Sequence, residues 1–190
     1  MGRDRKFSKI DLFVATKEQI LLVGYDGFTI SHLAGTLEVS RAAIYKQYTN
    51  KDELLIDFML YEMEQCISDL QKVRQDGTFE QQLEDLLNRM SNFNEVHQIL
   101  GMASLIQNVS EEVIQKKKQL SSMHGDLYAP LLRIVAKGKT EDYIASDMPE
   151  ALVLAFIFQT IDIPRQQNLT NDELLQYIKR LILHGVCSEK

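Results

Sequence analysis

Residues 29–45, TISHLAGTLEVSRAAIY, carry the strongest structural signal in the chain. Thr29 and Ser40 each precede a short run of residues with helical character, and Ser and Thr are preferred at helix N-caps. Apolar side chains follow each cap at helical spacing: Ile30, Leu33, Ala34 and Leu37 in the first run, Ala43 and Ile44 in the second. We therefore expect a helix-turn-helix, in which two short helices pack against a longer one and the second lies in the DNA major groove.

The outer face of the second short helix has the chemistry that this docking needs. Arg41, Lys46 and Gln47 are left on the outside, with the small Ala42 and Ala43 between them. Small residues allow a helix to sit deep in a groove. Arginine can bind guanine bidentately, and glutamine can do the same for adenine. This face is therefore the candidate base-reading surface.

Outside this stretch nearly everything is predicted to be helical, because only three prolines occur and alternating β-branched runs are absent. Gly24 is placed to end the first helix, and Pro130 is expected to kink a long one. Thr78 and Gln81 have the spacing of a capping box. We predict an all-α chain of about nine helices; besides the two short ones, they cover about residues 8–23, 50–74, 78–91, 95–108, 110–138, 149–161 and a last stretch from 170 or 171.

Composition and charge limit the kinds of protein that this chain can be. The chain has 190 residues, 45% hydrophobic content and a net charge of −6. Residues 1–50 nevertheless carry seven Lys and Arg against five Asp and Glu, so a mildly basic head is joined to an acidic body, although so small a difference also fits compositional noise. The longest apolar run, residues 151–158, is far short of the roughly 20 residues that span a bilayer. We expect a cytoplasmic protein with no secretory signal and no membrane partner.

The sequence lacks the common motifs of enzymes and cofactor-binding proteins. The sequence has no dinucleotide-binding glycine motif, P-loop, zinc-protease motif or nucleophile elbow, so we predict neither an enzyme nor a cofactor. The only cysteines, Cys66 and Cys187, have no metal-binding spacing; we expect two reduced thiols, with a regulatory disulfide as the alternative.

A family resemblance rests on a combination of motifs within residues 10–60. The chain resembles the TetR family of bacterial repressors in its Gly-Tyr pair at 24–25 and in residues 28–30, 33–34, 39–41, 44–45, 48 and 50–55. The resemblance implies a DNA-binding domain over residues 1–50, which continues into the start of the fourth helix, and an effector-binding and dimerisation domain over residues 51–190. It implies a homodimer that binds palindromic operator DNA and is released by a small-molecule effector.

The resemblance also implies roles for individual residues. Thr29, Tyr45 and Lys51 would contact phosphates. Bases or phosphates would be contacted by Ser40, Arg41, Ala42, Ala43, Lys46 and Gln47. The basic arm at residues 3–9 either tracks phosphates or is a solvated terminus. One position departs from the family: Glu38 stands in the turn where the family usually has glycine, which costs on the order of 1 kcal/mol if the backbone there is left-handed.

The family's effector pocket lies among the fourth to eighth helices. The candidate wall residues here are Phe58, Tyr61, Met63, Phe93, His97, Met102, Ile106, Met123, Tyr128 and Phe156, together with Met59 and Cys66. Methionine adapts to irregular shapes, so a lipophilic effector is expected; the alternative for any one of these residues is an ordinary core position. Residues 116–118, three consecutive lysines, are expected to form a solvated helix face.

Residues 151–158 are apolar all round the predicted helix. A helix without a polar face is buried on every side. It lies either between its own core and a partner subunit, which favours a dimer, or wholly inside the chain. A second function remains open for the whole protein: a helical carrier or sensor of lipophilic molecules that no longer reads DNA.

Overall fold

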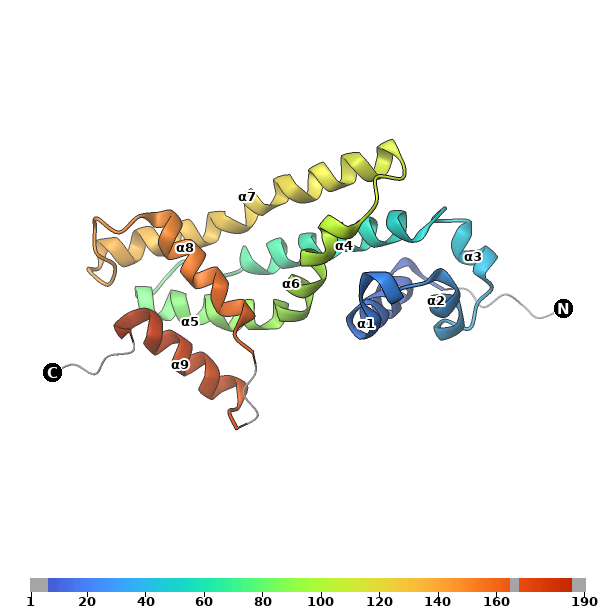
Figure 1. The fold of residues 1–190 in the computed structure, drawn as a ribbon. Helices are drawn as coiled ribbons and strands as arrows, with labels where there is room; N and C mark the ends of the chain where they lie inside the picture. The colour runs from blue at the N-terminus through green and yellow to red at the C-terminus, as the bar shows by residue number, and fades with distance from the viewer. Residues whose placement is uncertain (1–6, 165–167, 186–190) are drawn as a thin grey trace. The chain divides into compact units, whose positions relative to one another are not determined.

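The computed structural model describes residues 7–164 and 168–185 (Figure 1). Every regular element in these ranges is helical. The α-helices are α1 (Lys9–Gly27), α2 (Ile30–Thr36), α3 (Arg41–Tyr45), α4 (Lys51–Leu70), α5 (Phe79–Met90), α6 (Asn94–Gly101), α7 (Glu111–Thr140), α8 (Glu150–Gln159) and α9 (Asn171–His184). The short 3-10 helices are η1 (Ser91–Phe93), η2 (Met102–Leu105) and η3 (Thr160–Asp162). The all-α prediction is confirmed.

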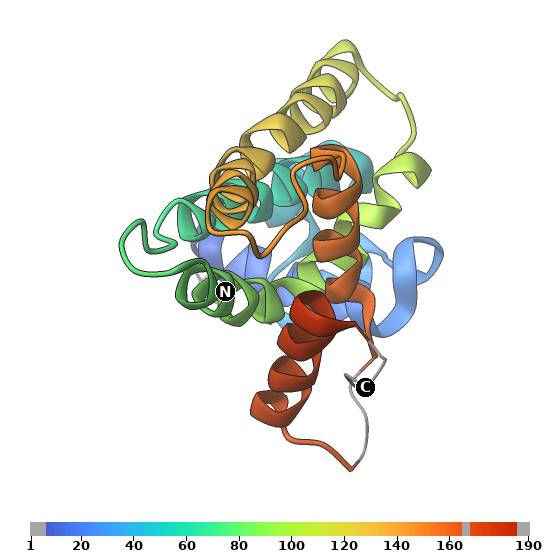
Figure 2. The same ribbon diagram turned by 90° about the vertical axis from the view of Figure 1, so that its left-hand side faces the viewer.

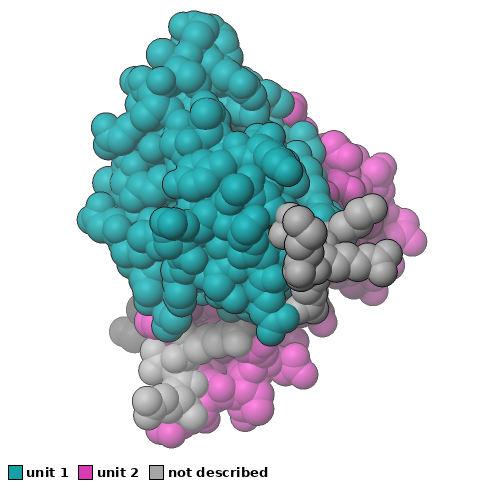
Figure 3. Space-filling view, turned by 90° about the vertical axis from the view of Figure 1, so that its right-hand side faces the viewer, with its two compact units in different colours: residues 1–64, 95–123 teal, residues 65–94, 124–190 magenta. Residues whose placement is uncertain are grey.

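The chain divides into two compact units, coloured separately in Figure 3. Unit 1 consists of residues 1–64 and 95–123, and unit 2 of residues 65–94 and 124–190. Helices α4 and α7 each contribute one end to unit 1 and the other end to unit 2. The head therefore forms one compact body with the start of α4, α6 and the first part of α7.

Local sequence signals explain where the helices begin. The side chains of Thr29 and Ser40 accept hydrogen bonds from the backbone amides of His32 and Ala43, as N-caps do. The predicted capping box at Thr78 is present, with Gln81 as its second member. Two helices end earlier than predicted. Helix α4 ends at Leu70 rather than near residue 74, and α6 is followed by η2 after Gly101 instead of continuing to about residue 108.

Unit 1 has a continuous apolar core. Leu12 and Ile20 of α1, Leu33 of α2 and Ile44 of α3 are completely buried. The ring of Phe13 lies 5.5 Å from the ring of Phe58 on α4, a separation at which tilted aromatic rings attract each other. Helix α2 thus packs against α1 and α3, and α1 contacts α4 through these two rings.

Unit 2 is built around α5 and the second part of α7, with α8 and α9 following (Figure 2). Its core includes Leu83 and Leu86 of α5 and Leu131 and Val135 of α7, all completely buried. Gly138 marks a close approach. A Cβ atom there would lie 2.8 Å from Cε2 of Phe79, on α5, and 2.6 Å from Cδ1 of Ile144. Only glycine fits at this position without movement of its neighbours.

Helix α8 is not buried on every side in the single chain. Leu154 and Ile157 are buried, whereas Leu152 is 59% exposed and Phe156 is 53% exposed. The alternative of a wholly internal helix is therefore wrong, because one face of α8 has no covering element within the described part of the chain. Among residues 7–164 and 168–185, no helix combines the length and the apolarity required to cross a membrane.

Candidate DNA-binding face and effector cavities

The face predicted to read bases is exposed. Ile44 is completely buried and holds α3 against the core, while Arg41, Ala42 and Tyr45 are exposed to solvent. Gln47, in the turn that follows, is also exposed. All four side chains are therefore accessible to a partner.

The end of α3 differs slightly from the prediction without disturbing this face. The α-helix ends at Tyr45, but the next turn continues its direction, since Lys46 N donates to Ala42 O at 3.1 Å. Lys46 is exposed, whereas Ala43 is half-buried. Ala43 therefore has less access to a groove than its neighbours.

Thr29, predicted to contact a phosphate, and Ser40, predicted to contact a base or a phosphate, are also accessible. Both residues are exposed, and each hydroxyl already accepts one backbone N–H as a helix cap. A hydroxyl has a donor as well as two acceptor lone pairs, so capping leaves its O–H available for a phosphate oxygen. The two roles are compatible.

Arg41 has a neighbour that the sequence did not reveal. Its Nη1 atom lies 3.4 Å from the hydroxyl oxygen of Ser31 on α2. The contact is long and exposed, and it directs the guanidinium toward the first helix of the motif. The two residues lie on different helices, so only the packing of α2 against α3 brings them together.

Lys51 makes contacts inside the head. Its ammonium donates to the backbone oxygen of Tyr25 at 2.9 Å and lies 4.0 Å from the centre of the Tyr25 ring. It therefore joins the start of α4 to the end of α1 and forms a cation–π pair. The ammonium has three N–H groups, so its predicted phosphate contact remains a prediction alongside this structural role.

A buried carboxylate secures the same region. Asp52 Oδ1 accepts the hydroxyl of Tyr25 at 2.7 Å and the backbone amide of Gln107 at 3.0 Å. Burial, together with this hydrogen bond to an anion, raises the pKa of Tyr25 to about 12. Asp52 thereby connects α1 to the segment between η2 and α7.

A second carboxylate, Asp57, lies further along α4. Lys9 Nζ and Lys116 Nζ each lie 2.8 Å from its carboxylate oxygens, and the Tyr48 hydroxyl donates to it at 2.8 Å. Burial alone would raise the pKa of Asp57, but the bonds from Lys116, Lys9 and Tyr48 outweigh it and bring the pKa to about 2. This carboxylate is therefore ionised at neutral pH and holds three segments together.

Two of the three consecutive lysines do not lie on the solvated face that the sequence predicted but make contacts within the chain. Lys116 pairs with Asp57, and Lys117 Nζ donates to the backbone oxygen of Ile106 at 2.7 Å. Both are half-buried, and only Lys118 is exposed. The prediction was wrong for these two residues because their partners lie on other segments of the chain.

The turn of the motif is left-handed at Glu38, so of the two possibilities, an altered turn or a tolerated strain, the structure has the strain. Glu38 has a φ of 55°, in the left-handed region. Gly24, the predicted end of the first helix, has a φ of 67°, and the helical φ/ψ run of α1 is interrupted there. Glycine adopts this conformation freely, whereas glutamate at position 38 adopts it at a cost.

The candidate effector residues are distributed over both units. Phe58, Met59, Met63, Cys66 and Ile106 are buried, and the half-buried ones are Tyr61, Phe93, His97, Met102 and Met123. Tyr61 lines an open groove of about 450 Å³ beside α1, and Phe156 lines an apolar groove of about 380 Å³ beside α8. Tyr128 is exposed and packs on Phe158, with 5.3 Å between ring centres. Their role in binding an effector remains a prediction.

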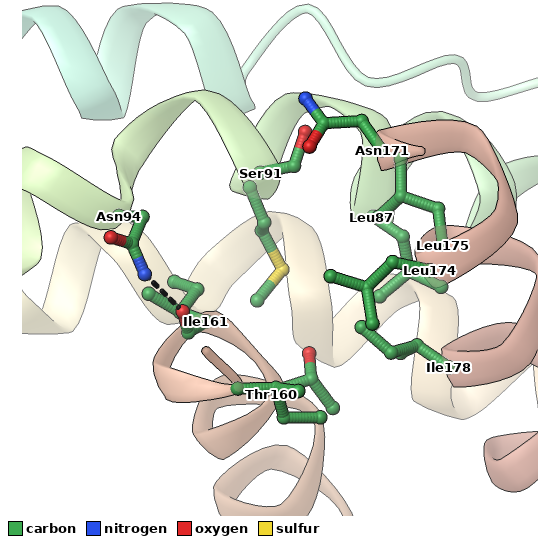
Figure 4. A pocket seen from close by; sticks show the side chains of 11 residues that line it. Leu87, Ser91, Asn94, Thr160, Ile161, Asn171, Leu174, Leu175 and Ile178 are labelled. Carbon is green, nitrogen blue, oxygen red and sulfur yellow. Dashed lines mark hydrogen bonds between the residues drawn. The ribbon is translucent and has the colours of Figure 1, made fainter. Parts of the chain in front are cut away.

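A small cavity in unit 2 involves residues that the sequence did not single out (Figure 4). It has a volume of about 40 Å³, and the Asn94 amide beside it donates to Ile161 O at 2.7 Å. A cavity needs roughly 10–15 Å³ of such space to hold one water, so this one has room for a few waters rather than for an organic effector. It is lined by Leu87, Met90, Ser91, Asn94, Thr160, Ile161, Ile163, Asn171, Leu174, Leu175 and Ile178.

Two features predicted from the sequence lie wholly or partly outside the described residues. The basic arm is described only from Phe7 onward, and Cys187 is not described. Cys66 is buried and is not in a disulfide with any described residue. No group of three or more potential metal ligands occurs in the ranges that the structure describes.

The fold and the exposed face of α3 define a helix-turn-helix protein. Residues 12–58 match the model of the bacterial regulatory proteins of the tetR family. By this match the N-terminal helix-turn-helix domain is of the type found in that family.

Solved structures share the fold over nearly the whole chain. The regulator PfmR from Thermus thermophilus is 19% identical with a TM-score of 0.71, covering 93% of this chain and 99% of its own. FadR from Bacillus subtilis, solved with stearoyl-CoA, is 19% identical with a TM-score of 0.64, covering 95% and 100%. AibR, solved with isovaleryl coenzyme A and operator DNA, is 14% identical with a TM-score of 0.75, covering 92% and 97%. No curated protein matches the chain.

Proposed function

We propose that this protein is a cytoplasmic repressor that binds a palindromic operator as a homodimer and is released by a small lipophilic effector. The observation that carries the DNA-binding part is the exposure of Arg41, Tyr45, Lys46 and Gln47 in α3 and the turn that follows it. Arg41 and Gln47 are the residues assigned to bases, because their side chains can bond bidentately to guanine and adenine. Thr29, Tyr45 and Lys51 are assigned to phosphates of the DNA backbone, and Ser40 to a base or a phosphate.

The homodimer is supported by the uncovered apolar surface of unit 2. Leu152 and Phe156 of α8 and Tyr177 and Leu181 of α9 are all exposed. Burying such side chains against a second copy removes apolar area from water, which stabilises association. Two recognition helices then reach successive major grooves about 34–36 Å apart on one side of the DNA, and this spacing requires a palindromic site.

The lipophilic effector is supported by the aromatic and methionine side chains of the body and by two fold neighbours. FadR and AibR were solved with acyl-coenzyme A molecules. The head has direct bonds to the rest of unit 1 through Asp52 and Asp57, so a change in α4 or α7 is transmitted to the helix-turn-helix. An effector that binds the DNA-incompatible arrangement more tightly shifts the population away from the operator.

A binding titration with DNA from the protein's own upstream region tests the proposal. We expect tight, salt-sensitive binding to a palindrome and loss of binding when one half-site is scrambled. Arg41→Ala should weaken binding, while Lys118→Ala, which removes an exposed cation on α7, should leave it unchanged. Equal binding to palindromic and scrambled DNA at every salt concentration contradicts the proposal and favours a carrier that does not read DNA.

A further inference from the structure

A basic hollow lies in unit 2, where the segment after α4 and the start of α5 face the second part of α7. Its volume is about 180 Å³. Val73, Pro130 and Ile134 are buried and form its apolar floor. The remaining lining residues are polar or cationic: Arg74, Gln75, Gln82, Arg133 and Lys137.

Three cations converge on this hollow from two segments that are distant in sequence. Arg133 and Lys137 are spaced by about one turn of α7, so they lie on one face of the helix. Arg74 comes from the segment after α4. The hollow thus has three cationic side chains in its wall, in a chain whose net charge is −6. Positive charge that carboxylates do not already compensate attracts an anion.

The three cations differ in how far they are already neutralised. Lys137 pairs with Glu141 at 2.6 Å, and Arg74 Nε pairs with the exposed Asp76 at 3.2 Å. Arg133 is exposed and makes no hydrogen bond or ion pair with any residue in the described ranges. Its guanidinium therefore retains all five donors for a ligand, in the planar arrangement that suits a phosphate.

The segment that carries Arg74 is held in place before any ligand arrives. The Arg74 amide donates to Asp85 Oδ2 at 2.8 Å. The buried amide of Gln82 donates to the backbone oxygens of Gln75, at 2.8 Å, and of Asp76, at 3.2 Å. Because this segment is tied to α5 at the arginine and just after it, a ligand does not have to order it, which favours binding.

We infer that this hollow binds the phosphate group of an organic phosphate ester, with Arg133 as its principal ligand and Lys137 and Arg74 beside it. Guanidinium–phosphate pairs are strong because two parallel N–H groups meet two oxygens. The apolar floor accommodates the carbon side of the ester. The inference rests on the proposed function only in identifying this ester with the effector; the binding itself stands independently.

Calorimetric titration of the full-length protein tests the site. The probes are coenzyme A, as an organic phosphate ester, and inorganic pyrophosphate, as the anion alone. We expect coenzyme A to bind with an affinity that falls as salt rises, and Arg133→Gln to weaken it about tenfold or more, since a charge-assisted hydrogen bond is lost. Arg133→Lys should retain part of the affinity. The matched control Lys118→Gln, an exposed cation on the same helix, should change nothing.

Arg133 has no partner among the described residues, so its replacement removes no internal contact there, and unaltered melting of Arg133→Gln is expected. Binding of coenzyme A that is insensitive to Arg133→Gln overturns the site, as does the absence of binding. If pyrophosphate binds but coenzyme A does not, the assignment of the ligand as an organic ester is overturned. If the protein binds its operator but not coenzyme A, only this site is refuted. If it binds coenzyme A but not the operator, only the proposed function is refuted.

Discussion

The hydroxyl of Tyr48, just beyond the end of α3, donates to the carboxylate of Asp57 on α4 at 2.8 Å. The same carboxylate pairs with Lys9 at the start of α1 and with Lys116 on α7. One side chain thus joins both ends of the head to a helix outside it. A similar arrangement links Asp52 to Tyr25 and to the Gln107 amide. These two carboxylates are where we expect changes in unit 1 to reach the helix-turn-helix.

Replacing Asp57 with Asn should destabilise unit 1 by on the order of 2 kcal/mol near neutral pH, because a pKa of about 2 lies well below its ordinary value of 3.8. A lowered carboxylate pKa contributes stability above the unfolded pKa and loses it as the pH falls through the folded pKa. The difference between wild type and variant should therefore shrink from about pH 4 to about pH 2. Urea unfolding at several pH values measures it. Glu64→Gln, an exposed carboxylate on the same helix, is the control, and a constant difference across this range would refute the prediction.

The strain at Glu38 should be visible in a short substitution series. Glycine relieves a left-handed φ but adds flexibility to the unfolded chain, so Glu38→Gly should be neutral or stabilising by up to about 1 kcal/mol. Glu38→Val should destabilise by about 1 kcal/mol or more, because a β-branched residue is least tolerant of this backbone. Denaturant unfolding ranks the three proteins. Equal stability of the glycine and valine variants would mean that the turn relaxes.

Gly138→Ala should destabilise unit 2 by about 1–3 kcal/mol, since the new Cβ would press on Phe79 and Ile144. Gly125→Ala, in the same helix, is its matched control: no heavy atom lies within 4 Å of the added Cβ. That change should stabilise by up to about 1 kcal/mol through helix propensity. Thermal melting of both variants measures the two changes in stability. A stabilising effect at position 138 would contradict the close packing.

Arg41 and Lys51 should differ in their effect on operator recognition. Arg41→Ala should lose about 1–3 kcal/mol of discrimination at one base pair, whereas Lys51→Ala should weaken binding to all sequences about equally. Lys51→Ala should also lower the stability of the head, because the bond to Tyr25 O is lost. Fluorescence anisotropy on an operator and its point mutants measures the first effect, and unfolding measures the second. Identical specificity profiles would refute the division between base and phosphate contacts.

Introducing a charge on the exposed face of α8 should abolish the homodimer. Phe156→Glu would place a carboxylate where apolar side chains are expected to meet a second copy. Light scattering after size exclusion should then report a monomer. Leu22→Glu, at a 78% exposed apolar position on α1, should leave the mass unchanged. A wild-type chain that is monomeric at high concentration would rule out the dimer.

Much of this molecule was predictable from its sequence because it depends on neighbours along the chain. The caps at Thr29, Ser40 and Thr78 act on amides within the first turn of the helices they begin, and helical spacing indicated that Ile44 is buried. The sequence identified position 38 as the place where a left-handed turn would be strained, and the backbone there has a φ of 55°. These features are local, so the order of residues determines them.

Other features depend on residues that are far apart in the chain, and folding alone brings these together. Lys116 was predicted to belong to a solvated run, yet it pairs with Asp57 because α7 packs beside α4 in unit 1. Nothing in the sequence distinguished Arg133, which shares a hollow with Arg74 only in the folded chain. Spacing along a helix predicts which residues share its face, but charges on separate helices meet only where packing of the apolar faces brings those helices together.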